Sequence, residues 1–260
     1  KKNFFTVLDN AKKLGFAESN PIADLNGDDS AAKIRILSSL AFNKSISKNK
    51  ILIEGIQNIN LTDIHYAKKF GFKIKLLSIS EIKSNKLIER VHPCLVKNSS
   101  LLSNINGVLN AVVIEGSPVG KSVLQGEGAG PGPTTSSLIS DLCSIMRGNI
   151  KYPFGISSKK RMNVSKFDIL KHICSSYLRI EVKDIPGVLS SITKSFAKNK
   201  ISIKDLLQNP DKKRKVATII IITHETAEKN YKNLFLNLSK NKFILKRPTF
   251  IRIENFNDNR

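Results

Sequence analysis

The order of short apolar segments in the last third of the chain limits the possible folds most strongly. Some of these segments are rich in β-branched residues, as strands are, and others repeat apolar residues at helical spacing. In chain order they are predicted as strand 177–182, helix 188–199, strand 200–208, strand 215–223, helix 225–241 and strand 243–254. The order βαββαβ is that of the ferredoxin-like plan, in which two helices cover one antiparallel sheet.

The first 148 residues predict a different mixture of helices and strands. Helices are expected over 4–14, from Asp28 onward, from Thr62 to Gly71, and from Thr134 onward, and FAESNPIADLNG (16–27) is expected to be an irregular loop. Strands are expected at 51–56, 72–80, 87–96, 110–116 and 121–126. We therefore predict an α+β chain: a mostly β sheet covered by helices over 1–148, a polar linker over 149–174, and a ferredoxin-like domain over 175–256.

The charge balance is strongly basic, with a formal net charge of +22 over 260 residues. Such a charge is compatible with nucleic acid or with smaller anionic ligands. The lysines are scattered along the whole chain and are not interleaved with aromatic residues, so we expect no nucleic-acid partner. The longest apolar runs, such as ATIIII (217–222), are far too short to cross a bilayer, and no membrane partner is expected.

The cysteines and histidines give no sign of a metal site. Cys94, Cys143 and Cys174 are widely spaced and form no CxxC motif, which favours reduced thiols in a cytoplasmic protein. The four histidines share no ligand spacing, and we expect them to be structural or surface residues. They are His65, His92, His172 and His224.

The stretch ADLNGDDSAAK (23–33) carries three aspartates and a lysine around a predicted helix start. Asn26 or Asp28 can cap the helix, and acidic residues favour its positive end. Asp29 and Lys33 are four residues apart and can form a surface ion pair, which stabilises a helix by about 0.2–0.5 kcal/mol. A structural role therefore explains these residues by spacing alone, but it does not explain Asp24 or the nearby Glu18.

The longer string AKKLGFAESNPIADLNGDDSAAK (11–33) resembles the signature segment of homoserine dehydrogenases. The resemblance continues in EGI (54–56), RVHPCLV (90–96), NAVVIEG (110–116) and GEGAGPGPTTSSLISDL (126–142), so it covers nearly all of residues 1–148. It implies NAD(P)-dependent interconversion of homoserine and aspartate 4-semialdehyde, in threonine and methionine biosynthesis, by a homo-oligomer.

The same resemblance implies roles for four residues of the signature. Lys33 takes the role of proton donor, because an ammonium group can stabilise the oxyanion that forms as hydride reaches the aldehyde. Glu18 matches the position that binds homoserine, and Asp24 and Asp29 match positions that help to orient substrate and lysine. Asp28 falls at a variable position and keeps its role as a cap.

The glycine-rich loop GEGAGPGP (126–133) precedes a predicted helix with hydroxyl caps. Glycines let a ligand approach the backbone, and free N–H groups at a helix start attract anions. The loop can equally be a flexible connection. In the resembled family it faces the NAD or NADP cofactor, which implies Gly126, Glu127 and Gly128 as contacts.

That family also carries a Rossmann unit with a glycine-rich pyrophosphate turn, and residues 1–260 contain no such motif. We expect the chain to be a fragment that needs the missing segment for activity. The alternative is a non-catalytic protein that senses an amino acid.

The string DIPGVLSSITKSFAKNKISIKDLLQ (184–208) resembles the opening of an ACT domain. In that family small amino acids bind at the turn into the first helix, so the resemblance implies Asp184, Pro186 and Gly187 as effector contacts, with threonine as the effector. A role in dimerisation alone is the alternative.

Overall fold

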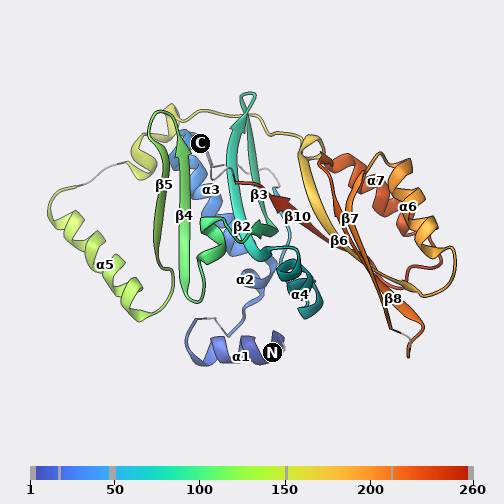
Figure 1. Cartoon of the computed structure of the whole chain (residues 1–260). Coiled ribbons are helices and arrows are strands. Elements are labelled where there is room, and N and C mark those ends of the chain that lie inside the picture. The colour runs from blue at the N-terminus through green and yellow to red at the C-terminus, as the bar shows by residue number, and fades with distance from the viewer. Residues whose placement is uncertain (1–3, 17–18, 47–50, 150–151, 212, 257–260) are drawn as a thin grey trace.

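The computed structural model describes residues 4–16, 19–46, 51–149, 152–211 and 213–256 (Figure 1). One eight-stranded sheet runs through it in the order β1-β3-β10-β6-β8-β7, with β2 paired to β3 and β9 to β6. Its strands are β1 (Leu52–Ile53), β2 (Phe72–Lys83), β3 (Lys86–Lys97), β6 (Ile173–Lys183), β7 (Ile203–Asp211), β8 (Val216–Thr223), β9 (Thr226–Ala227) and β10 (Thr249–Glu254). A separate two-stranded sheet joins β4 (Leu109–Gly116) to β5 (Gly120–Glu127).

The helices flank the large sheet on both faces or project from it. They are α1 (Phe4–Lys13), α2 (Ile22–Asn26), α3 (Asp28–Phe42), α4 (Leu61–Lys69), α5 (Pro131–Met146), α6 (Val188–Lys198) and α7 (Glu228–Leu238). Short 3-10 turns at 153–155, 158–160 and 169–171 interrupt the segment predicted as a linker. No helix in the described part of the chain is long and apolar enough to span a membrane.

The C-terminal unit has the predicted βαββαβ order, and its strands lie in the order β10-β6-β8-β7. The α+β fold class is therefore confirmed. The last strand is shorter than predicted, because β10 begins at Thr249 and leaves 243–248 outside the ladder. Pro248 precedes this start, and a proline cannot donate a backbone hydrogen bond to a neighbouring strand.

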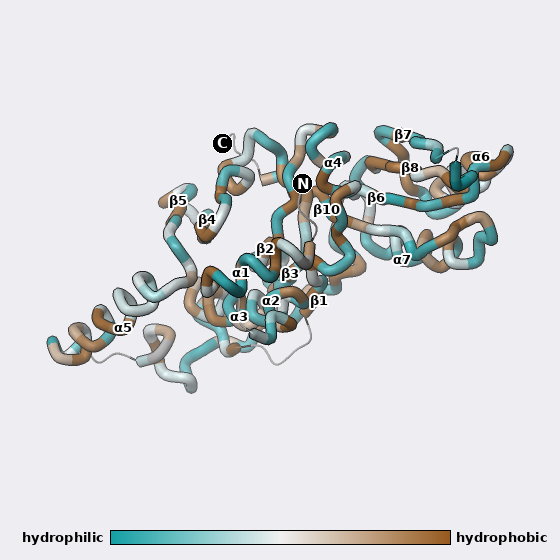
Figure 2. The backbone as a smooth tube through the Cα atoms, turned by 90° about the horizontal axis from the view of Figure 1, so that it is seen from below, coloured by the Kyte–Doolittle hydropathy of each residue, from teal (hydrophilic) through white to brown (hydrophobic). Residues whose placement is uncertain are grey.

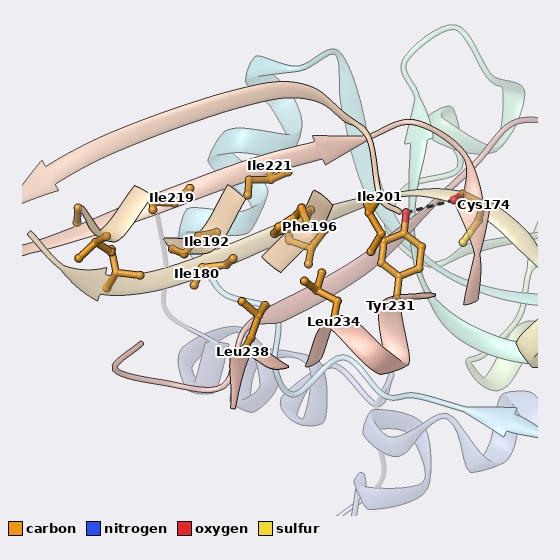
Figure 3. Close-up of a cluster of buried hydrophobic side chains, with 14 residues drawn as sticks. Cys174, Ile180, Ile192, Phe196, Ile201, Ile219, Ile221, Tyr231, Leu234 and Leu238 are labelled. Atoms are coloured by element: carbon orange, nitrogen blue, oxygen red, sulfur yellow. Dashed lines mark hydrogen bonds between the residues drawn. The ribbon is translucent and has the colours of Figure 1, made fainter. Parts of the chain in front are cut away.

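Four consecutive isoleucines of β8, Ile219–Ile222, are all buried because both faces of the sheet are covered. Ile219 and Ile221 face the core beneath α6 and α7, and Figure 3 shows them with Phe196 of α6 and Leu234 of α7. Ile220 and Ile222 face the opposite way and pack in a cluster with residues of α4. A continuous apolar run is the pattern expected of a strand buried on both sides.

The strand β10 joins the two halves of the chain. It pairs antiparallel with β6 of the C-terminal unit and parallel with β3 of the N-terminal part, where Arg252 lies opposite Cys94. The sequence did not predict this parallel pairing. Because β10 pairs with strands of both halves, the two predicted domains share one sheet.

Two predictions for the start of α3 are wrong. Residues 22–26 form the short helix α2 where an irregular loop was expected, and Gly27 ends it with a φ of 85°. Neither Asn26 nor Asp28 caps α3: Gly27 stands at the N-cap position, with no side-chain cap. Asn26 instead accepts a hydrogen bond from the Gln57 amide at 2.6 Å. Asp28 and Asp29 remain in the first turn, where their charge suits the helix dipole.

Two other helix starts also differ from the prediction. α4 begins one residue early, because Asn60 and Asp63 form a reciprocal capping box. α5 begins at Pro131, with Gly130 at the N-cap position and no side-chain cap. The hydroxyl of Thr134 donates to the Gly130 carbonyl, one turn back, so it does not act as the expected cap.

Helix α5 stands apart from the sheet. None of its described residues is buried, and Leu138, Ile145 and Met146 are more than 60 % exposed. Figure 2 shows the helix projecting from the body with hydrophobic residues along it. The β4–β5 hairpin, which precedes α5 in the chain, is also largely exposed, so neither element has the packed core seen around the large sheet.

Candidate functional site

The predicted catalytic residue Lys33 and the predicted substrate-binding residues Asp24 and Asp29 lie on two helices that meet at Gly27. We call residues 19–33 the substrate segment, after the role that the sequence predicts for its charged side chains. In it Asp24 belongs to α2, and Asp29 and Lys33 belong to the first turns of α3. Asn20 begins the segment by accepting a hydrogen bond from the Ile22 backbone N–H at 3.3 Å. Glu18 falls outside the described residues.

Gly27 is a point of close packing as well as a helix junction. A side chain there would press on Val91 of β3 and Ile53 of β1, with a Cβ at 3.2 Å and 3.3 Å from their methyl groups. Its positive φ would also strain any L-residue. The glycine thus sets both the turn between the two helices and their distance from the sheet.

A second glycine fixes the segment from the other side. The Cβ of any side chain at Gly55 would collide with the carbonyl oxygen of Leu25, and the same carbonyl accepts a hydrogen bond from the Ile56 N–H at 2.9 Å. Gln57 adds the hydrogen bond to Asn26 described above. The EGI stretch that follows β1 is therefore the surface on which α2 rests.

Asp29 and Lys33 meet directly, with Asp29 Oδ2 at 2.7 Å from Lys33 Nζ. Their side chains are 40 % and 70 % exposed, so the pair contributes little to stability and remains open to a ligand. Asp24 is exposed on α2, and its carboxylate forms no hydrogen bond or ion pair with another residue that the structure describes, although its backbone carbonyl accepts from the Gly27 N–H at 3.3 Å. The structure brings Asp29 and Lys33 together and leaves Asp24 on the adjoining helix.

The glycine-rich loop lies elsewhere, at the end of β5 and before α5. Gly126, Glu127 and Gly128 are all exposed. A Cβ added at Gly126 would meet no other atom within 4 Å, so on that side there is room for a ligand to approach the backbone. At Gly128 a Cβ would collide with the amide end of the exposed Asn110 side chain, so any larger residue there requires that side chain to move.

The predicted effector turn borders a cavity of 380 Å³. Gly187 stands at the N-cap position of α6 in a left-handed conformation with a φ of 86°. Gln208 of β7 donates a hydrogen bond to the Asp184 carboxylate at 3.4 Å. The cavity is lined by Lys183, Asp184, Ile185, Pro186, Gly187, Val188, Leu189, Gln208 and Ile219. All three predicted effector residues are therefore among its walls.

Sequence reasoning missed a charged cluster, built around two buried arginines, where β10 joins the two halves. Arg252 of β10 is hydrogen-bonded to both carboxylate oxygens of Glu228 and to both of Glu54. Arg90 of β3 binds both oxygens of Glu254 at 3.1 Å and also Glu81 at 3.0 Å. We call these six residues the junction network. The alternation of charged and apolar residues in FIRIE (250–254) was the available signal, but it is equally typical of a solvent-exposed face.

The junction network shifts the protonation of its neighbours. Burial lowers the pKa of Arg252, but hydrogen bonds to Glu228 and the charge of Glu54 outweigh it, so the net shift is upward. Burial and the two arginines lower the pKa of His92 well below its usual value. Burial raises the pKa of Cys174 to about 12.

Two three-residue groups in this region have ligand atoms close enough to suggest a metal: His92, Cys94 and Glu254, and His172, Cys174 and Glu228. In each group the carboxylate is already held by an arginine, at Arg90 or Arg252. A cation would have to compete with that guanidinium. The arrangement is therefore better described as an ion-pair network than as a cation site.

Comparison with known proteins identifies the family. The homoserine dehydrogenase family pattern matches residues 1–143, and the ACT domain pattern matches residues 176–235. The chain belongs to the homoserine dehydrogenase family. The matched ranges contain Asp24, Asp29, Lys33 and the glycine-rich loop in the first part, and the effector turn in the second.

Curated and structural relatives agree with this assignment. The chain is 37% identical over 253 residues to homoserine dehydrogenase of Helicobacter pylori, covering 97% of this chain, and 36% identical over 262 residues to that of Neisseria gonorrhoeae, covering 98%. A homoserine dehydrogenase structure from Thiobacillus denitrificans superposes with a TM-score of 0.86 at 31% identity, covering 98% of this chain and 59% of that one. The chain spans 60% of the length of each of the two curated relatives.

Proposed function

We propose that the protein containing this chain interconverts L-homoserine and L-aspartate 4-semialdehyde with NAD or NADP. The observation that carries the proposal is the exposed Asp29–Lys33 pair, at the start of a helix that is firmly seated on the sheet. We further propose that the chain supplies the substrate site and an effector site, and that the protein works as a homo-oligomer. The free thiols Cys94, Cys143 and Cys174 fit a cytoplasmic protein.

Lys33 is the proposed proton donor. During reduction the aldehyde oxygen gains negative charge, which an ammonium group stabilises and then neutralises by giving up a proton. Asp29 holds the ammonium group at 2.7 Å, so it sets the position of Nζ before transfer. In the oxidative direction the same amine accepts the hydroxyl proton of homoserine.

The substrate carries an ammonium group of its own, and carboxylates suit that group. Asp24 offers an exposed carboxylate on α2, one helix turn before Gly27, and we propose that it orients the substrate amine together with Glu18. The bound nicotinamide supplies or accepts the hydride. We propose that the loop at Gly126, Glu127 and Gly128 lies against it, since Gly126 leaves its backbone open.

The test compares two variants of the full-length protein. Lys33→Ala removes the proton donor, and Asp28→Ala removes a carboxylate from the first turn of the same helix without touching the proposed chemistry. We expect Lys33→Ala to lower kcat for homoserine oxidation about 10²- to 10⁴-fold and Asp28→Ala to leave it nearly unchanged. Equal activity of Lys33→Ala and wild type would overturn the assignment and favour the amino-acid-sensing alternative.

A second proposal concerns the ACT turn. The cavity beside Gly187 is small enough for an amino acid, has backbone N–H groups at the start of α6, and has the Asp184 carboxylate at its wall. We propose threonine as its ligand. Calorimetric titration of threonine into the full-length protein should give binding heat that Asp184→Ala removes. The control variant Asp205→Ala, at the other end of β7, should retain it. No heat at millimolar threonine would favour a role in dimerisation alone.

A further inference from the structure

The position of the substrate segment depends on the short stretch that follows β1. Leu25 and Asn26 of α2 are hydrogen-bonded to Ile56 and Gln57, and the glycine at 55 lets the two backbones touch. Because the backbones of Gly55 and Leu25 are in direct contact, a shift of the 54–57 backbone must move α2, and with it Asp24.

Glu54 begins that stretch and is held in two ways. Its backbone N–H donates to the Val91 carbonyl of β3 at 2.8 Å. Its carboxylate accepts two hydrogen bonds from Arg252, at 2.7 Å from Nη1 and 3.3 Å from Nη2. The partner lies 198 residues away in the chain, so this contact is a tertiary one that the local sequence does not impose.

The Arg252 side chain is 4% exposed and is itself fixed on several sides. Its other edge binds Glu228, the first residue of α7, and its guanidinium carbon lies 4.9 Å from the centre of the Phe250 ring. A planar guanidinium can serve two carboxylates at once with fixed angles, which a lysine ammonium cannot do.

We infer that Arg252 is a positioning residue for the substrate segment, acting through Glu54 and the 54–57 stretch on Asp24 and the start of α3. This inference rests on the proposed function, because it concerns the affinity for homoserine. Arg252 lies in the strand that closes the C-terminal unit and also holds α7 of that unit. The geometry of the substrate segment therefore depends on the C-terminal unit being folded in place.

The test needs a variant that disturbs an equivalent buried ion pair elsewhere. Arg179 of β6 provides it: it is 10% exposed, and it binds Asp63 of α4 through Nε at 2.7 Å and Nη2 at 3.2 Å. Both arginines reach from the C-terminal unit to a carboxylate of the N-terminal part. Of the carboxylates Glu54 and Asp63, only Glu54 adjoins the contact with α2. Arg179→Lys is therefore the matched control for Arg252→Lys.

In the full-length protein, Arg252→Lys should raise KM for homoserine about tenfold while kcat stays within about twofold. Arg179→Lys should leave KM unchanged even if both variants melt at similarly lower temperatures. Equal KM changes in the two variants, or none in Arg252→Lys, would overturn the inference.

A second readout does not depend on activity. Hydrogen exchange followed by mass spectrometry should show faster exchange of the amides in 22–29 for Arg252→Lys than for Arg179→Lys, with similar exchange in α5. If the 22–29 amides exchange faster in Arg252→Lys than in Arg179→Lys but the wild-type protein does not turn over homoserine, the proposed function fails while the positioning role stands. If the 22–29 amides exchange equally in both variants, the positioning role fails whatever the activity.

Discussion

The substrate segment and the junction network use the same kinds of charged side chain in opposite surroundings. Asp29 and Lys33 form one ion pair whose members are 40 % and 70 % exposed. Arg252 is 4% exposed and is saturated by two carboxylates. An exposed pair exchanges water and partners at little cost, whereas a buried pair is stable only as a complete set. The Asp29–Lys33 pair is thus open to solvent, whereas Arg252 is enclosed and bound by two carboxylates.

Exposed and buried ion pairs should differ most in what they contribute to the free energy of unfolding. Lys44 and Glu89 form a buried ion pair at 2.9 Å, with side chains 2% and 3% exposed. Lys44→Ala leaves a buried carboxylate without its partner, and we expect a loss of about 3–5 kcal/mol in the free energy of unfolding. Lys33→Ala should change it by no more than about 0.5 kcal/mol.

Urea unfolding of the two lysine variants measures this difference. The double variant Lys44→Met with Glu89→Leu serves as the control, because replacing both buried charges by apolar side chains should recover most of the loss. If Lys44→Ala and Lys33→Ala were equally stable, the distinction between structural and open charges would not hold.

An intermediate effect concerns acid stability near the junction network. Burial, followed by the charges of Arg90 and Arg252, lowers the pKa of His172 to about 4. In the unfolded chain His172 takes up its proton near pH 6.5. Above that pH the side chain is neutral in both the folded and the unfolded state, so it does not change the free energy of unfolding. Stability then falls as the pH drops from about 6.5 toward 4. We expect His172→Gln to reduce this fall by about 1–2 kcal/mol after allowing for solvent screening.

Urea midpoints measured between pH 4 and 7.5 test the prediction. Some slope should remain in His172→Gln, because the lowered pKa of His92 acts in the same direction. His224→Gln, at an exposed position, controls for the loss of a histidine. An unchanged slope in His172→Gln would mean that the junction network does not hold this side chain neutral.

The smallest effect is a local one, seen in thiol reactivity. Burial raises the pKa of Cys94 well above its usual value and that of Cys174 to about 12, whereas Cys143 is partly exposed on the projecting helix α5. At pH 8 we expect iodoacetamide to modify Cys143 on the order of 100-fold faster than the other two. Peptide mass spectrometry reads this directly, and rapid labelling of Cys94 would contradict the closed packing of the junction network.

The sequence predicted the local elements well and the long-range ones poorly. The βαββαβ order follows from apolar spacing within each segment, and the Asp29–Lys33 contact follows from helix geometry alone. The pairing of β10 with β3 could not be predicted, because the apolar residues of each strand fit burial beside many other strands and do not specify this partner. Nothing within FIRIE (250–254) specifies that Arg252 meets Glu54 rather than water.

The predictions of which residues cap α3 were wrong for a related reason. Asn26 has a suitable side chain and position for capping, but a tertiary hydrogen bond from Gln57 occupies it. Gly27 takes the cap position because packing against Val91 and Ile53 leaves no room for a side chain. Local propensity is overridden where two backbones must approach closely.

The place of β10 in the sheet has a consequence for how the chain is made on the ribosome. About 150 residues separate the end of β3 from the start of β10, and synthesis at about 5–20 residues per second takes roughly ten to thirty seconds to cover them. During that interval β1 covers that edge of β3 only at Arg90 and Val91, so residues 94–96, which will receive β10, have no partner strand there. An open stretch of edge invites pairing with other chains. Slow translation or early termination between these strands should therefore favour aggregation of the nascent protein.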